Sequence, residues 1–132
     1  MVKLTNEIKE SLEGAKNIFL ATCSADKIPN VVPMGAFKLL DEETLLISDQ
    51  YMNKTLKNVV SNPHAAITYW GEKGGYQIKG TVTVHTNDKV FEDDVEWMKI
   101  RFPKLKPKGA LVIKITGVYA IKPGVEPGQK IL

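Results

Sequence analysis

The chain has 132 residues, a length that fits one domain with a single hydrophobic core. Its apolar fraction of 43% and charged fraction of 25% argue against disorder. The net charge of +3 is too small for a dedicated nucleic-acid binder, and the single cysteine excludes a disulfide within the chain. Because no apolar segment has the length of a signal peptide or a membrane span, we expect a cytoplasmic protein without a membrane partner.

The first half of the chain predicts one helix followed by three strands. Thr5 or Asn6 caps the helix, and Ile8 and Leu12 share one of its faces. Apolar runs bounded by turn residues predict the strands, which cover residues 17–23, 30–40 and 44–48. Pro33 and Gly35 interrupt the second of these strands.

The second half predicts two helices and three further strands. Asn53 is a plausible N-cap for one helix, and Asn87 or Asp88 opens the other. The strands cover residues 64–70, 76–84 and 110–121. Short turns between successive strands favour antiparallel pairing, and six such strands hide their edges most easily by closing on themselves. We therefore predict a mainly β fold with peripheral helices, a six-stranded antiparallel barrel, followed by an irregular tail from Pro123.

Familiar catalytic and metal-binding motifs are missing. The sequence has no glycine-rich phosphate loop, and Cys23, His64 and His85 each stand alone, so we expect no metal site. No catalytic triad can be assembled from these residues.

Residues 49–55, DQYMNKT, lead from a strand into a helix and form the first candidate site. A helix N-terminus presents unpaired N–H groups and the positive end of the helix dipole. Lys54 is disfavoured there unless an anion lies beside it, so the segment is a candidate phosphate site. The alternative is a helix capped by Asn53 with Lys54 in solvent.

Residues 31–37, VVPMGAF, form the second candidate site. Pro33 cannot donate to a sheet ladder and indicates an edge strand or a bulge, while Gly35 allows a close approach to the backbone. A flat heteroaromatic ring needs such exposed backbone groups around its polar rim. The alternative is an edge strand with a bulge and no ligand.

Three segments in this order resemble the FMN-binding split barrels related to pyridoxamine 5′-phosphate oxidase, in particular its compact members. They read PNVVPMGAFKLLD, TLLISDQYMNKTLKNVVSNP and GYQIKGTVTVHT. The resemblance covers roughly residues 17–121. It implies a six-stranded split barrel spanning residues 1–132 as one domain, with FMN bound in a homodimer.

The resemblance also implies positions for the cofactor. It places the FMN phosphate at Asn53, Lys54 and Thr55, and the isoalloxazine against the backbone of Val32, Pro33 and Met34. It further implies that Ser48 and Asp49 lie near the ring, that Gln77 approaches the cofactor, and that the tail after Pro123 folds over the flavin of the partner subunit.

Several functions remain open on the sequence alone. The chain lacks the Arg- and His-containing C-terminal substrate segment of the oxidases proper, so oxidation of pyridoxamine phosphate is not implied. One hypothesis is an FMN-dependent oxidoreductase of a small substrate, and another is a non-catalytic FMN carrier for electron transfer or flavin storage. A barrel that binds nucleic acid through Lys104, Lys106 and Lys108 is disfavoured by the weak net charge.

Overall fold

The computed structural model describes residues 2–72, 74–121 and 128–132. Its helices are α1 (Asn6–Glu13), α2 (Lys54–Ser61) and α3 (Lys89–Arg101). Its strands are β1 (Ile18–Cys23), β2 (Pro29–Met34), β3 (Phe37–Leu39), β4 (Thr44–Asp49), β5 (His64–Thr68), β6 (Tyr76–His85) and β7 (Gly109–Ala120). The predicted class, mainly β with three helices, is confirmed.

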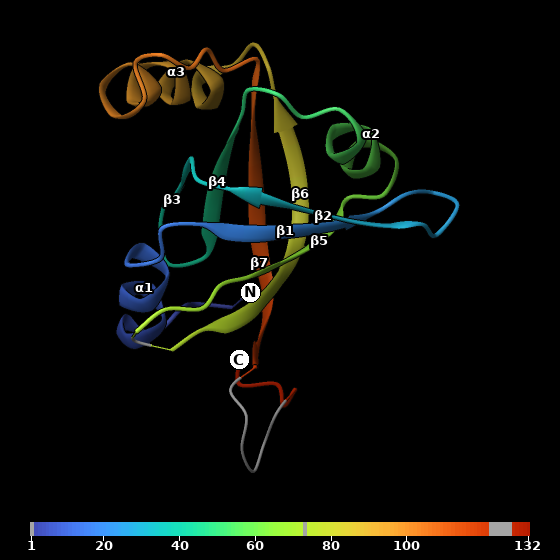
Figure 1. The fold of residues 1–132 in the computed structure, drawn as a ribbon, viewed down its shortest axis with the longest axis vertical. Coiled ribbons are helices and arrows are strands. Elements are labelled where there is room, and N and C mark those ends of the chain that lie inside the picture. Colours follow the sequence, from blue (N-terminus) through green and yellow to red (C-terminus); the bar gives the residue numbers. More distant parts are fainter. Residues whose placement is uncertain (1, 73, 122–127) are drawn as a thin grey trace.

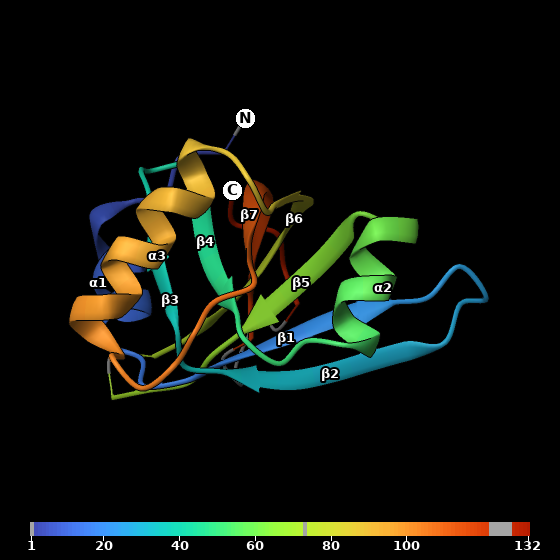
Figure 2. The same cartoon turned by 90° about the horizontal axis from the view of Figure 1, so that it is seen from above.

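The strands form one antiparallel sheet in the order β2-β1-β5-β6-β7-β4-β3. The sheet curls into a half-barrel with β2 and β3 as its two edges (Figure 1). Helix α1 packs against β3, α2 against β1, β2 and β6, and α3 against β7 (Figure 2). No helix among the described residues is long and apolar enough to cross a membrane.

The prediction of six strands is wrong, because the expected strand over residues 30–40 is two strands. Gly35 and Ala36 separate β2 from β3, and the two pair with different neighbours at opposite edges of the sheet. Pro33 lies on the edge strand β2, where its missing N–H costs no ladder bond. The chain therefore turns a corner from one edge of the half-barrel to the other.

Strand β4 is buried on both of its faces. Leu45 and Ile47 belong to the main core inside the half-barrel. Leu46 and Ser48 point the other way and are also buried, although they lie outside that cluster. Helix α3 covers this outer face, where Met98 and Asp94 are fully buried. A polar residue on β4 is thus enclosed between the sheet and a helix.

All three helix starts agree with the sequence analysis, and two of them have a side-chain cap. Thr5 caps α1 by accepting a hydrogen bond from the Ile8 N–H at 3.3 Å, and Asp88 caps α3. Asn53 occupies the predicted N-cap position of α2, but its side chain makes no capping hydrogen bond. Half of the predicted tail, residues 123–127, lies outside the described residues.

Candidate functional site

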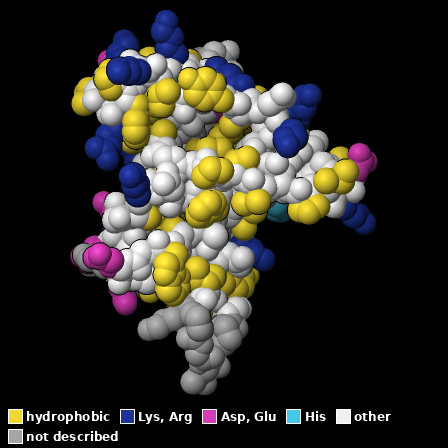
Figure 3. All heavy atoms as spheres, in the orientation of Figure 1, with side chains coloured by type: hydrophobic (Ala, Val, Ile, Leu, Met, Phe, Trp, Pro, Cys, Tyr) yellow, Lys and Arg dark blue, Asp and Glu magenta, His cyan; other side chains and the backbone are white. Residues whose placement is uncertain are grey.

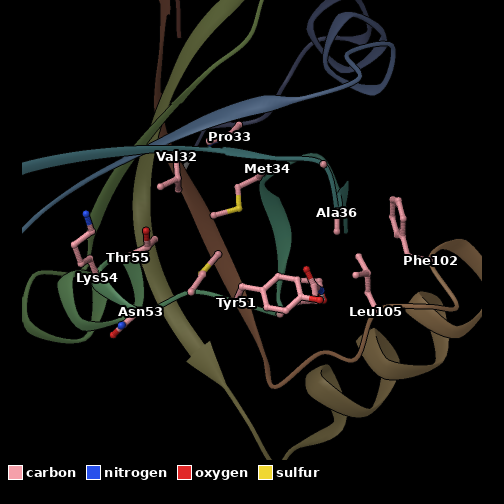
Figure 4. Close-up of a pocket in the computed structure, with 14 residues that line it drawn as sticks. Val32, Pro33, Met34, Ala36, Tyr51, Asn53, Lys54, Thr55, Phe102 and Leu105 are labelled. Carbon is pink, nitrogen blue, oxygen red and sulfur yellow. Dashed lines mark hydrogen bonds between the residues drawn. The ribbon is translucent and has the colours of Figure 1, made fainter.

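A cavity of about 430 Å³ lies between β2, the loop after β4 and the start of α2 (Figure 4). This volume is within the range of small-molecule and cofactor sites. We call it the main pocket, and it is lined by Val32, Pro33, Met34, Gly35, Ala36, Ser48, Gln50, Tyr51, Met52, Asn53, Lys54, Thr55, Phe102 and Leu105.

The start of α2 forms one end of the main pocket. Lys54 is the first helical residue, and the first turn contains no acidic side chain that would favour the helix dipole. Lys54 and Asn53 are both exposed, and neither forms a side-chain hydrogen bond or ion pair among the described residues. This end of the pocket therefore presents a positive charge and unpaired backbone N–H groups to an incoming anion.

A buried polar cluster holds this helix start in place. The Asn30 amide of β2 donates to the Thr55 hydroxyl at 3.0 Å and to the Thr22 hydroxyl at 3.2 Å. The Asn58 amide of α2 also donates to Thr22, at 3.0 Å. Because Thr55 accepts from Asn30, its own hydroxyl proton remains available to a ligand in the pocket.

The opposite end of the main pocket is apolar. Figure 4 shows Phe102 and Leu105 at the end away from Lys54, with Met34 and Ala36 along the wall between them. Tyr51 also lines the cavity and is 82% exposed. An elongated ligand with an anionic end and a flat apolar end matches this distribution of side chains.

The wall between these two ends contains a buried hydrogen-bond chain. The Gln50 amide nitrogen donates to the Ser48 hydroxyl at 2.7 Å, and Ser48 donates to Asp94 Oδ2 at 2.7 Å. Burial raises the pKa of the Asp94 carboxyl, while the Ser48 hydrogen bond and the charge of Lys38 act in the opposite direction. Asp94 itself does not line the pocket and lies on the buried face of helix α3.

Asp49 shapes the loop from β4 to α2. Its Oδ1 accepts a hydrogen bond from the Met52 N–H at 2.8 Å, and its Oδ2 lies 4.0 Å from Lys108 Nζ. Lys108 also donates to the Met52 carbonyl. Burial raises the pKa of Asp49, and the Met52 N–H and Lys108 lower it.

The structure brings seven of the nine predicted cofactor residues to the main pocket: Val32, Pro33, Met34, Ser48, Asn53, Lys54 and Thr55. Asp49 is next to the pocket without lining it. Gln77 lies apart on β6, opposite Thr68 of β5 and Tyr119 of β7.

Sequence reasoning missed other residues of this region. Phe102 and Leu105 come from the loop after α3, and no local pattern linked that loop to the pocket. Asp94 had a detectable signal: it falls on the helical face that carries Phe91 and Met98, and a carboxylate on an apolar stripe is costly to bury.

A second cavity of about 640 Å³ adjoins the main pocket, and both are lined by Gly35 and Phe102. Its basic side chains are Lys16, Lys38 and Arg101, and Lys38 Nζ lies 4.7 Å from the centre of the Trp97 ring. A Cβ built on Gly35 would meet Asn17 Oδ1 at 3.3 Å, and Asn17 lines the second cavity only. Gly35 thus leaves space on the side of the second cavity.

No group of three or more His, Cys, Asp or Glu side chains within the described ranges could hold a metal ion.

The family follows from a comparison with known sequences. The family model of pyridoxamine 5′-phosphate oxidase matches residues 4–122, which is most of the chain. The chain therefore belongs to this family. An uncharacterized protein of Methanocaldococcus jannaschii is 46% identical over 134 residues, covering 99% of this chain and 89% of the relative.

Solved structures share the fold at low sequence identity. HupZ of Group A Streptococcus has a TM-score of 0.83 at 23% identity, covering 95% of this chain and 99% of its own. An FMN-binding protein of Syntrophomonas wolfei has a TM-score of 0.72 at 12% identity, with coverage of 90% and 86%. HutZ, a heme storage protein of Vibrio cholerae, has a TM-score of 0.67 at 19% identity, with coverage of 90% and 95%. These likenesses concern the fold.

Proposed function

We propose that this chain binds FMN in the main pocket and works in the cytoplasm as an oxidoreductase of a small substrate. The observation that carries the proposal is the pocket itself, which runs from the Lys54 end of α2 to an apolar end at Phe102 in a member of this family. FMN would supply electron transfer to and from the substrate.

The residues present fit this cofactor at both ends. Lys54 and the first N–H groups of α2 suit a phosphate, and the missing Asn53 cap leaves those N–H groups available. Val32, Met34 and Met52 offer an apolar wall for a flat ring. A heme is less well matched, because the described lining residues include no histidine or cysteine to ligate its iron and offer only Tyr51, Met34 and Met52 as ligands.

The second cavity favours a catalyst over an electron or storage carrier. A carrier needs room for its cofactor only, whereas this chain has an adjoining cavity of about 640 Å³ with three basic side chains. An anionic substrate would be attracted there and would lie beside the main pocket. Saturable reduction of bound FMN by NADH or NADPH supports the oxidoreductase, and FMN binding without reduction by either supports the carrier.

The outer face of β1 and β2 supports a homodimer. Phe19 is 46% exposed and Val31 64% exposed, and Pro33 lies opposite Phe19 in the paired strands. Figure 3 shows hydrophobic side chains gathered over this part of the surface. Gln77 of β6 does not line its own main pocket, so in our proposal it reaches a cofactor only across the dimer.

Replacement of Lys54 tests the phosphate site. Lys54→Ala removes a charge-assisted contact worth about 1.5–3 kcal/mol, so the affinity for FMN should fall at least about tenfold. The affinity for riboflavin, which lacks the phosphate, should barely change. Both affinities are measured by the quenching of flavin fluorescence on binding.

Lys57→Ala is the matched control, because Lys57 is an exposed lysine one turn further along α2 and does not line the pocket. It should leave both affinities unchanged. Equal losses for FMN and riboflavin in Lys54→Ala would contradict the assigned role, and a wild-type protein that binds neither flavin would overturn the proposed function.

A further inference from the structure

Asp94 is a buried carboxyl group that the proposed function leaves unused. It is 0% exposed, and its Oδ1 is a buried oxygen without a hydrogen-bond partner among the described residues. Its Oδ2 accepts from Ser48, which lines the main pocket. Buried polar atoms almost always have partners, and burying a carboxylate is costly, so a group in this position calls for an explanation.

Few charges surround this carboxyl. Lys38 of β3 is the charged side chain that acts on it electrostatically. On α3 itself, the neighbours Asp93 and Glu96 are exposed and paired with lysines of the same helix. On β4, the adjacent Asp49 is engaged by the Met52 N–H, and residues 109–112 of β7 carry no ionisable side chain. A change in the protonation of Asp94 therefore affects the pocket mainly through its hydrogen bond with Ser48.

The charge on Asp94 dictates the direction of the hydrogen-bond chain. An ionised carboxylate only accepts, so the Ser48 hydroxyl must donate to Asp94 and must accept from the Gln50 amide nitrogen. Gln50 Oε1 then takes no part in this series of hydrogen bonds, and it has no hydrogen bond among the described residues. A protonated Asp94 can instead donate to Ser48, which then donates to Gln50, and the Gln50 amide turns its N–H groups outward.

We propose that Asp94 is a positioning residue that sets, through Ser48 and Gln50, whether the wall of the main pocket presents a hydrogen-bond acceptor or a donor to the bound ring. The inference rests on the proposed function, because it takes the flavin as the ligand. In the ionised state the wall presents Gln50 Oε1, which suits an N–H on the ring's edge. In the protonated state the wall presents the amide N–H groups and loses that contact.

The direction of the pH effect follows from the environment. Burial raises the pKa of Asp94 above its usual 3.8, so the carboxyl takes up its proton at a higher pH than an exposed aspartate does. The ring contact should be present above this raised pKa and should be lost as the pH falls through it.

The test is the affinity for riboflavin as a function of pH. Riboflavin is used instead of FMN, because a phosphate monoester titrates at about pH 6 and the FMN phosphate would add its own pH dependence. For the wild-type protein we expect the affinity to fall by up to about tenfold from the alkaline to the acid side of the transition, as for the loss of one hydrogen bond.

Two variants should abolish this pH dependence. Asp94→Asn removes the titrating group, and Ser48→Ala leaves Asp94 able to titrate but cuts its link to Gln50. Asp93→Asn is the matched control, because Asp93 is exposed on the same helix and should keep the wild-type profile. A thermal melt of each variant verifies that it is folded.

The possible outcomes separate the two proposals. A pH profile that persists in Ser48→Ala, or in a folded Asp94→Asn, overturns the role of Asp94 while flavin binding stands. A pH-independent wild-type affinity overturns it as well. A wild-type protein that binds neither riboflavin nor FMN at any pH overturns the proposed function and this inference together.

Discussion

Thr55 ties the fold to the end of the main pocket where we propose that the phosphate binds. Its side chain is buried, accepts from Asn30 and still has a hydroxyl proton to donate. Thr55→Val keeps the shape and removes the hydroxyl, so the affinity for FMN should fall about tenfold and the free energy of unfolding by about 1 kcal/mol. Thr55→Ser should restore most of the affinity. Flavin titration and urea unfolding measure the two effects, and a valine variant with wild-type FMN affinity would contradict the donor role.

Sequence reasoning could find single residues whose side chains are unfavourable at their position in a helix or strand. Lys54 was recognisable because a lysine in the first turn of a helix opposes the dipole. Ser48 was expected from the family resemblance, but its link to Asp94, 46 positions away, was not, and Phe102 depends on how the loop after α3 returns to β2. Such long-range contacts leave no spacing signal in the chain.

In our proposal, helix α2 gives up some stability in order to bind an anion. Lys54→Glu replaces an unfavourable charge at its N-terminus with a favourable one, so the unliganded protein should become more stable by about 0.3–1 kcal/mol. The same variant should gain no stability from added FMN, whereas the wild type should gain. Urea unfolding with and without FMN measures both effects. A glutamate variant that FMN still stabilises would argue against a phosphate at this helix end.

The helices and strands were largely predictable, because the alternation of apolar and polar residues and the capping residues are local signals. The exception is the expected strand over residues 30–40, where the apolar pattern continues across the corner at Gly35 and Ala36. Local periodicity cannot show that β2 pairs with β1 while β3 pairs with β4. Pro33 did indicate an edge strand, and the structure has β2 at the edge of the sheet.

At the scale of the whole molecule, the uncovered face of β1 and β2 predicts the dimer contact. Val31→Glu places a charge in this apolar surface, so the dissociation constant of the dimer should rise by more than about tenfold. Val60→Glu is the control, because Val60 is 70% exposed on α2 and away from this face. Sedimentation at micromolar concentration measures the result. A dimeric Val31→Glu protein would place the contact elsewhere.

The corner at Gly35 and Ala36 also has a consequence for the order of folding. The two residues join the β1–β2 and β3–β4 hairpins, whereas the pairings of β1 with β5 and of β4 with β7, which complete the half-barrel around them, join elements far apart in the sequence. Pairings of this kind are slow to form, so the wall of the main pocket is completed late. A ligand bound at a late-forming wall leaves the folding rate unchanged and slows unfolding, so the loaded protein should outlast the empty one mainly in kinetic lifetime.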